Sequence, residues 1–223
     1  MKITRQTIDI LKNFSSINPS IVVKEGSALE TISTMKNILA KSKIVEDFDR
    51  QFAIYDLTEF LGLVTSEALV NAELEFEENW VNMVNGKSSS RYYYADESTI
   101  IKPEKKLEMP EPEIHFELSK LDLSTALSMS GILSKPDLGI VSDGKTISAL
   151  ILDKKDPTSD FFEIGVGEGN GDEYVMYFKI ENLKILKGSY SVGISSRGIG
   201  HFSNQDIELE YWIALEPDSE YNI

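Results

Sequence analysis

The chain has 223 residues, no cysteine, two histidines and a formal net charge of −15, from 37 acidic and 22 basic residues. Its hydrophobic content of 41% suffices for one large domain or two smaller ones, and is too high for a disordered acidic chain. The absence of cysteine excludes disulfides, thiolate nucleophiles and cysteine-ligated metals, and the acidic balance argues against nonspecific nucleic-acid binding by the bulk surface.

The N-terminus has no uninterrupted apolar stretch of the kind that a signal peptide needs. No apolar run approaches the ~20 residues of a membrane-spanning helix. These features predict a soluble intracellular protein without a membrane partner.

In the first half, helical spacing predicts a helix over Thr4–Phe14, with apolar residues on one face and charged residues on the other. A second helical stretch is predicted within residues 57–71. The predicted strands of this half are Ile21–Lys24, Ala28–Thr34, Ile38–Ile44, Leu69–Trp80 and Ser89–Ala95.

The middle of the chain is rich in proline and charge, which favours an extended connector. We therefore predict two domains, residues 1–101 and 113–223, joined by a linker over residues 102–112.

The second half repeats the pattern of the first. Ser119 is a candidate N-cap for a helix over Ser119–Leu133, and Asp122 three residues on makes an imperfect capping box. An Asp-Gly pair predicts a hairpin between strands Leu138–Ser142 and Thr146–Leu152. A further helix is predicted over residues 179–188, followed by strands Ser189–Ser195 and Ile207–Leu215.

Residues 53–63 can be laid on residues 176–186 in apolar and polar pattern, which suggests an internal repeat. The sequence thus predicts an α+β fold of two similar domains, each with two helices packed on largely antiparallel sheets.

Most motifs of catalysis and nucleotide binding are absent. The glycine-rich segment Gly165–Gly171 lacks the G-x-G-x-x-G spacing and precedes an apolar strand rather than a helix. We interpret it as a hairpin loop, and the acidic pairs of the chain as solvated surface.

Charge is distributed unevenly along the chain. The four predicted helical stretches, residues 1–18, 57–71, 118–136 and 179–188, carry +2, −2, +1 and +2. They total +3, so the remaining chain carries −18. This pattern predicts one mildly basic helical surface on an acidic body, although exposed helices often carry lysines for their helix propensity alone.

Several segments resemble the DNA sliding clamps of T-even-like phages, which are DNA polymerase processivity factors related to PCNA. They are Leu11–Asn18, Ala53–Gly62, Asp96–Ile101, Asn182–Tyr190 and Ala214–Ser219. The resemblance spans nearly the whole chain in order.

This resemblance implies a closed homotrimeric ring with helices around a central hole that holds duplex DNA without sequence specificity. Few, long phosphate contacts would permit sliding. The expected DNA-facing cations are Lys2, Arg5, Lys12, Lys120, Lys135, Lys179, Lys184 and Lys187.

Ring closure requires edge strands that pair between subunits. The resemblance implies Ser89–Ala95 against Thr158–Gly165, with Tyr92, Tyr93, Tyr94, Phe161 and Phe162 as candidate interface residues. Because neighbouring strand residues face opposite ways, alternate members must belong to their own domain's core.

The family also binds C-terminal peptides of partners in an apolar pocket near the linker. The candidate lining residues are Ile100, Ile101, Leu107, Met109, Leu215 and Pro217. Implied partners are the phage DNA polymerase, an ATP-driven clamp loader and late-transcription factors, in the cytoplasm of the infected bacterium. No catalytic residues, metal or cofactor are implied.

An alternative is an acidic, β-rich phage structural protein or DNA mimic that does not encircle DNA. Such a protein would present rows of carboxylates and would not form a ring.

Overall fold

The computed structural model describes residues 1–104 and 107–222. The chain forms two compact units, Met1–Lys105 and Lys106–Ile223. The division falls within the predicted linker over residues 102–112, of which positions 105 and 106 lie outside the described residues.

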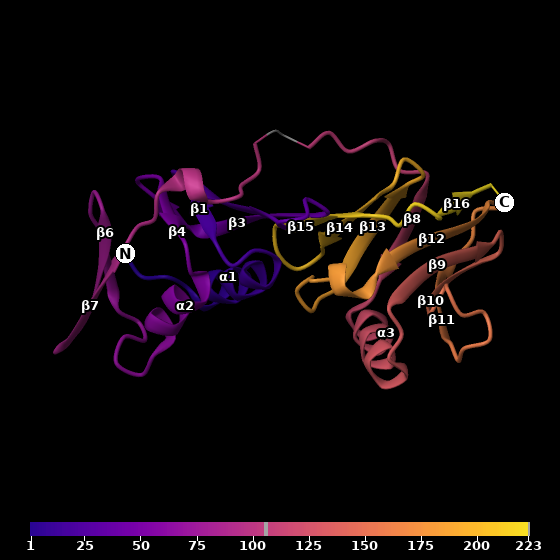
Figure 1. The fold of residues 1–223 in the computed structure, drawn as a ribbon, viewed down its shortest axis with the longest axis horizontal. Coiled ribbons are helices and arrows are strands. Elements are labelled where there is room, and N and C mark those ends of the chain that lie inside the picture. The colour runs from indigo at the N-terminus through magenta and orange to yellow at the C-terminus, as the bar shows by residue number, and fades with distance from the viewer. Residues whose placement is uncertain (105–106, 223) are drawn as a thin grey trace. The chain divides into compact units, whose positions relative to one another are not determined.

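Unit 1 contains two α-helices against short antiparallel ladders (Figure 1). Helix α1 (Arg5–Ile17) packs against α2 (Leu57–Thr65) and against the strands β2 and β3. The ladders are β1 (Ile21–Val23) with β4 (Phe52–Ile54), β2 (Gly26–Ile32) with β3 (Ile38–Phe48), and β5 (Glu73–Phe76) with β6 (Trp80–Asn85) and β7 (Ser88–Tyr93). A 3-10 turn over Glu97–Thr99 follows.

The boundaries of α1 follow from local chemistry. Thr4 is the N-cap, and its side chain accepts a hydrogen bond from the backbone N–H of Thr7. The helix extends three residues beyond the predicted Phe14. Ser15 and Ser16 donate to the carbonyls one turn back, and Ile17 is buried in the core.

The predicted strand Leu69–Trp80 is wrong in extent. Residues 69–72 form a turn, β5 covers only Glu73–Phe76, and Trp80 begins a separate strand, β6. The amide N–H of Leu69 donates to the carbonyl of Ser66, which makes a turn at the start of this apolar segment. Two of its apolar residues, Leu69 and Ala72, are nevertheless buried.

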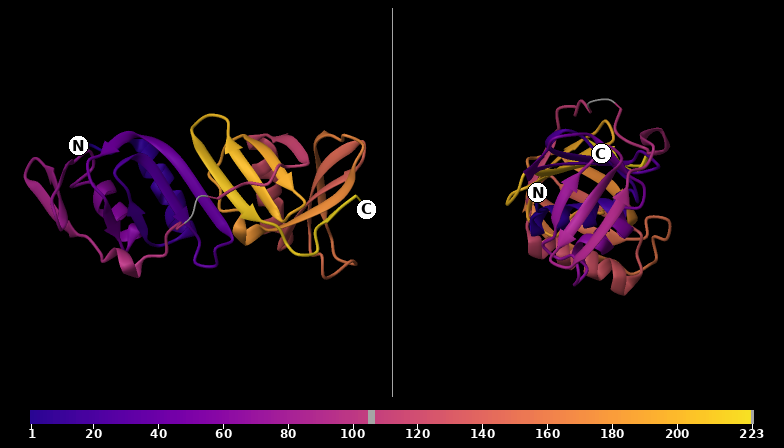
Figure 2. Two further views of the ribbon diagram at one scale, coloured as in Figure 1. Left: turned by 90° about the horizontal axis from the view of Figure 1, so that it is seen from above. Right: turned by 90° about the vertical axis from the view of Figure 1, so that its left-hand side faces the viewer.

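Among its described residues, unit 2 has one α-helix, α3 (Lys120–Leu133), which packs against β10 and β11 (Figure 1). Figure 2 gives two further views of the chain. The first sheet has the order β11-β10-β9-β12-β16, with strands Phe162–Glu168, Thr146–Leu152, Asp137–Asp143, Glu173–Lys179 and Glu220–Tyr221. The other strands of unit 2 pair antiparallel in the order β8-β13-β14-β15. They are β8 (Ile114–Leu118), β13 (Tyr190–Ser195), β14 (Ile199–Asn204) and β15 (Leu209–Ala214).

Two predicted features of unit 2 are confirmed. Ser119 caps α3, accepting a hydrogen bond of 3.1 Å from the Asp122 N–H. The Asp-Gly pair turns between β9 and β10, with Gly144 at φ +81°, a conformation that favours glycine.

The predicted helix over residues 179–188 is wrong. Only Ile180–Asn182 is helical, as a single 3-10 turn, and extended backbone follows it. Leu183 and Ile185 are buried while Lys184 between them is exposed, which is the period of a strand and not of a helix. Two tyrosines hold this segment: Leu186 donates its N–H to the Tyr211 hydroxyl at 3.1 Å and accepts from the Tyr190 hydroxyl at 2.5 Å.

Candidate nucleic-acid interface and subunit edges

The charge pattern of the helices differs from the prediction. Helix α1 carries +1, α2 carries −1 and α3 carries zero, so the three α-helices together are neutral. The predicted sum of +3 included flanking segments and a helix that does not form. The helical cations Arg5, Lys12 and Lys120 are thus balanced in number by Asp9, Glu59 and Asp122, and the other predicted cations lie outside the helices.

Most of the predicted cations are nevertheless accessible. Lys2, Arg5, Lys12, Lys120, Lys184 and Lys187 are exposed, and Lys135 is half-buried. The Nε atom of Arg5 lies 3.2 Å from Asp9, one helical turn away, and 76% of the Arg5 side chain is accessible. An exposed pair of this kind contributes little stability and leaves a cation available to a phosphate.

Lys179 differs from the other seven predicted cations, because its ammonium group is held by acidic side chains of unit 2. Its Nζ atom lies 2.5 Å from Oδ1 of Asp137, whose side chain is completely buried, and 3.9 Å from Glu216. Glu216 in turn pairs with Lys154 at 3.2 Å, and Lys154 pairs with Asp218 at 2.5 Å. This chain of charges ties the segment after β15 to β9 and β12.

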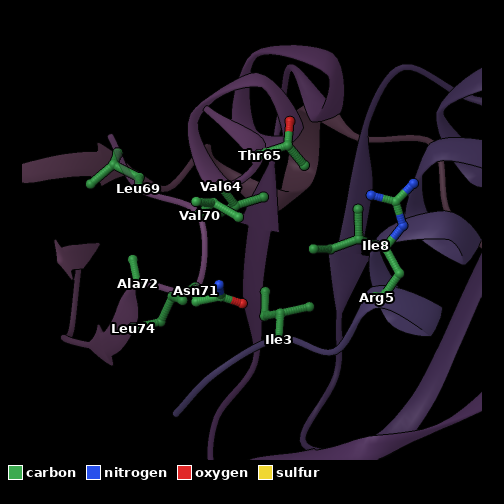
Figure 3. A pocket seen from close by; sticks show the side chains of 10 residues that line it. All are labelled: Ile3, Arg5, Ile8, Val64, Thr65, Leu69, Val70, Asn71, Ala72 and Leu74. Atoms are coloured by element: carbon green, nitrogen blue, oxygen red, sulfur yellow. The ribbon is translucent and has the colours of Figure 1, made fainter. Parts of the chain in front are cut away.

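A hollow of about 130 Å³ lies beside Arg5 in unit 1 (Figure 3). Its walls come from the N-terminal segment, the first turns of α1, the end of α2, the following turn and β5. Of its lining residues, only Arg5 is a candidate site residue from the sequence. The lining residues are Ile3, Arg5, Ile8, Val64, Thr65, Leu69, Val70, Asn71, Ala72 and Leu74.

The predicted edge strands Ser89–Ala95 and Thr158–Gly165 form only in part, as β7 and β11, and each of these lies at the edge of its sheet. Residues 158–161 are not a strand, because Thr158 and Ser159 belong to a turn in which the Ser159 N–H donates to the carbonyl of Asp156. Among the described residues of unit 1, β7 pairs only with β6, and within unit 2, β11 pairs only with β10. Tyr93 at the end of β7 and Phe161 immediately before β11 are each 63% exposed, so each of these two edges has an uncovered aromatic side chain on it or next to it.

The other candidate aromatics are more enclosed. Tyr92 packs edge-on against Phe60 at 5.5 Å between ring centroids, and Tyr94 stacks on Phe52 at 5.2 Å. Burial raises the pKa of Tyr94 to about 12, and its hydroxyl has no hydrogen-bond partner among the described atoms. Phe162 is half-buried. In both aromatic segments, residues 92–94 and 161–162, neighbouring side chains therefore alternate between the more buried and the more exposed face, as expected.

The candidate peptide-pocket residues are divided between the two units, and each set is described within its own unit. In unit 1, Ile100 is buried with Val22 and Ala53, while Ile101 is 42% exposed. In unit 2, Leu215 is buried, Met109 is half-buried, and Leu107 and Pro217 are exposed. The pocket itself stays a prediction.

A second hollow, of about 440 Å³, lies on the face of unit 2's first sheet that α3 does not cover, beside β11. No residue pattern in the sequence predicts this hollow directly. Leu150, Leu152, Val141, Tyr177 and Phe161 supply its apolar surface. An indirect sign of it is the unbroken apolar run at residues 149–152. A strand with such a run has apolar side chains on both faces of the sheet, and both faces then need to be covered.

The rim of this hollow is acidic. Asp153, Asp156 and Glu163 line it together with Lys154. The Lys154 ammonium is already engaged by Glu216 and Asp218, and it lies 5.3 Å from the centroid of the Tyr177 ring. The hollow therefore presents an apolar floor and net negative charge.

The described residues contain no group of three or more His, Asp or Glu side chains that could hold a metal ion. They also contain no helix long and apolar enough to cross a membrane.

Comparison with solved structures defines the fold class. The chain superposes on a PCNA from A. fulgidus, solved with the C-terminal region of FEN-1, with a TM-score of 0.71 at 14% identity over 96% of each chain. A DnaN sliding clamp from Pseudomonas aeruginosa gives a TM-score of 0.69 at 13% identity over 97% of this chain and 64% of that one. The fold is that of the DNA sliding clamps.

Sequence comparison then gives the family. The DNA polymerase processivity factor family matches residues 2–102. The sliding clamp of Vibrio phage KVP40 is 33% identical over 97% of this chain and 99% of its own length, and that of Enterobacteria phage T4 is 27% identical over the full length of both. The chain belongs to the sliding clamp family of T4-like phages, which are DNA polymerase processivity factors.

Proposed function

We propose that three copies of this chain close into a ring that encircles duplex DNA and tethers the phage replicative polymerase in the infected bacterium. The observation that carries the proposal is the pair of sheet edges, β7 in unit 1 and β11 in unit 2. An uncovered edge strand invites pairing with another chain. Contacts between two different patches of identical chains form a ring when the rotation closes.

Encirclement reconciles an acidic protein with a DNA function. Three copies would carry a formal charge of −45, so the outer surface repels DNA while the topology of a closed ring retains it. Retention by topology needs no tight phosphate contact. Helices of zero net charge, with a few exposed cations on them and beside them, suit a duplex that has to slide.

Within this proposal the DNA-facing cations are Lys2, Arg5, Lys12, Lys120, Lys135, Lys184 and Lys187. Lys179 serves mainly to hold Asp137. A closed ring needs an ATP-driven loader to open it, and a polymerase peptide would dock at the predicted linker pocket. The protein itself would perform no catalysis. No observation on the structure favours the late-transcription role or the DNA-mimic alternative.

The test is light scattering combined with DNA retention. The purified protein should have the mass of a trimer, and loaded protein should stay on circular plasmid and leave after the plasmid is linearised. A protein that remains monomeric at high concentration, or that leaves circular and linear DNA equally fast, would contradict the proposal.

A further inference from the structure

We propose a specific register for the contact between copies: β7 of one copy pairs antiparallel with β11 of the next, with Arg91 opposite Glu163 and Tyr93 opposite Phe161. This inference rests on the ring proposed above and goes beyond it, because it names the residue pairs that form the contact.

The faces of the two strands restrict the register. On β7, Tyr92 is buried toward Phe60, while Arg91 and Tyr93 are exposed. On β11, Phe162 lies opposite the buried Ile151, and Glu163 lies opposite Leu150 on the other face. A sheet that continues from one copy into the next keeps its buried faces together, so odd-numbered residues of β7 must meet odd-numbered residues of β11.

Registers that obey this rule differ by steps of two residues. In one, Arg91 meets Glu163, Tyr93 meets Phe161, and Tyr92 meets Phe162 on the buried face. Shifting β7 by two residues along β11 in one direction places Tyr93 opposite Glu163. Shifting it by two residues in the other direction places Arg91 opposite Phe161. Opposite charges and aromatic pairs directly across a ladder are stabilising, so the first register is favoured.

The exposed side chains of β7 are held in place before any contact forms. The Arg91 guanidinium lies 4.5 Å from the centroid of the Trp80 ring, and its Nε is 3.1 Å from Oδ1 of Asn82. Tyr93 packs edge-on against the same indole at 5.8 Å. Side chains already ordered in the free protein lose less conformational entropy on association.

The surface beside β11 complements this cluster in shape and charge. The apolar hollow of about 440 Å³ borders Phe161 and Glu163, which leaves room for a tyrosine ring from a second copy. Its acidic rim, with Lys154 neutralised by Glu216 and Asp218, favours an arginine. The two uncovered aromatics, Tyr93 and Phe161, would cover each other.

The β-bulge in β11 is also compatible with the proposed register. The ladder of β11 with β10 is regular from Phe162 to Gly165 and is then broken by a bulge before Gly167. In the proposed register Gly165 meets Ser89, close to the start of β7. The paired segments are therefore residues 89–93 and 161–165, and the bulge lies just outside them.

Engineered disulfides test the register directly, because the chain has no native cysteine. The double variant Ser89→Cys with Gly165→Cys places thiols at positions that the proposal makes directly opposite. The matched controls, Ser89→Cys with Glu163→Cys and Arg91→Cys with Gly165→Cys, are each one register step away on the same face. We expect the first pair to form covalent multimers about tenfold faster under mild oxidation, because a disulfide needs closely spaced Cβ atoms.

Faster linking of either control, in a protein that light scattering shows to be a ring, would overturn the register and leave the ring standing. Absence of linking in all three variants of such a ring would overturn the β7–β11 contact itself. A monomeric wild-type protein would instead contradict the proposed function.

A charge swap gives a second readout. Arg91→Glu should weaken association about fivefold, and adding Glu163→Arg should restore it. Lys87→Glu, which makes the same change of charge outside the paired segments, serves as the control. No rescue in the double variant, or an equal loss in the control, would overturn the Arg91–Glu163 pair.

Discussion

The Nζ atom of Lys179 lies 2.5 Å from Oδ1 of Asp137, a carboxylate with no solvent exposure in the middle of unit 2. The same Asp137 side chain accepts a hydrogen bond from the Lys154 N–H at 3.2 Å. A buried carboxylate needs such partners, because the loss of hydration is otherwise uncompensated. Lys179 is thus a structural residue of the sheet, although its sequence context suggested a contact to DNA.

Removal of the Lys179 charge should therefore destabilise the protein. We expect Lys179→Met to lower the free energy of unfolding by about 3 kcal/mol, because it leaves Asp137 buried without its cation. Urea unfolding followed by circular dichroism measures the loss. Lys187→Met, at an exposed lysine of the same region, should change stability by less than about 0.5 kcal/mol. Equal effects of the two variants would contradict the structural role.

The tyrosine pair that holds the segment after β12 gives a second prediction. Tyr211→Phe should destabilise the protein by about 1–3 kcal/mol, because the Leu186 N–H would lose the partner that it has at 3.1 Å. Thermal unfolding of the variant measures the effect. Tyr55→Phe removes a hydroxyl from a ring that is 66% exposed and should be nearly neutral. A neutral Tyr211→Phe would mean that this contact does not hold the segment.

Acid stability should depend on Glu46, a buried residue of β3. Burial alone would raise its pKa, but hydrogen bonds from the Thr7 hydroxyl, at 2.5 Å, and from the Thr4 N–H outweigh it, so the pKa of Glu46 is lowered. A carboxyl with a lowered folded-state pKa stabilises the protein above its unfolded pKa of about 4.3. That stabilisation is lost as the pH falls through the folded-state value.

Glu46→Gln should therefore show a smaller fall in unfolding free energy than the wild type when the pH is lowered from about 5 into the acid range. Unfolding in urea at a series of pH values provides the measurement. Glu75→Gln, at an exposed residue of β5, should keep the wild-type slope. A Glu46→Gln variant that also keeps the wild-type slope would show that Thr4 and Thr7 do not favour the charged carboxylate.

The DNA-facing role is tested by charge reversal at the helices. Arg5→Glu, Lys12→Glu and Lys120→Glu combined should reduce processive synthesis by about tenfold or more at moderate salt, because phosphates would face three new carboxylates. Primer extension with loader and polymerase measures product length, and circular dichroism checks folding. The control reverses Lys36, Lys145 and Arg197, three exposed cations in turns. Equal losses in both triple variants would remove the assigned role.

Local sequence signals were reliable where short-range chemistry decides the structure. Ser119 caps α3, and the turn at Gly144 follows from its Asp-Gly pair. Similarity of pattern between distant segments of the chain is a weaker guide to structure. The match of residues 176–186 to residues 53–63 predicted a second helix in unit 2, yet hydrogen bonds to Tyr190 and Tyr211 hold that segment extended.

Residue types and their order along the chain are therefore enough to predict the N-cap at Ser119, the Asp-Gly hairpin and, through the resemblance, the family. Three other features follow only from the folded chain: the neutral total charge of the helices, the pairing of Lys179 with Asp137, and the acidic rim of the hollow beside β11. The physical reason is that a charge acts according to its neighbours in space. Asp137 and Lys179 are 42 residues apart along the chain, and no periodicity in the sequence predicts that they form an ion pair.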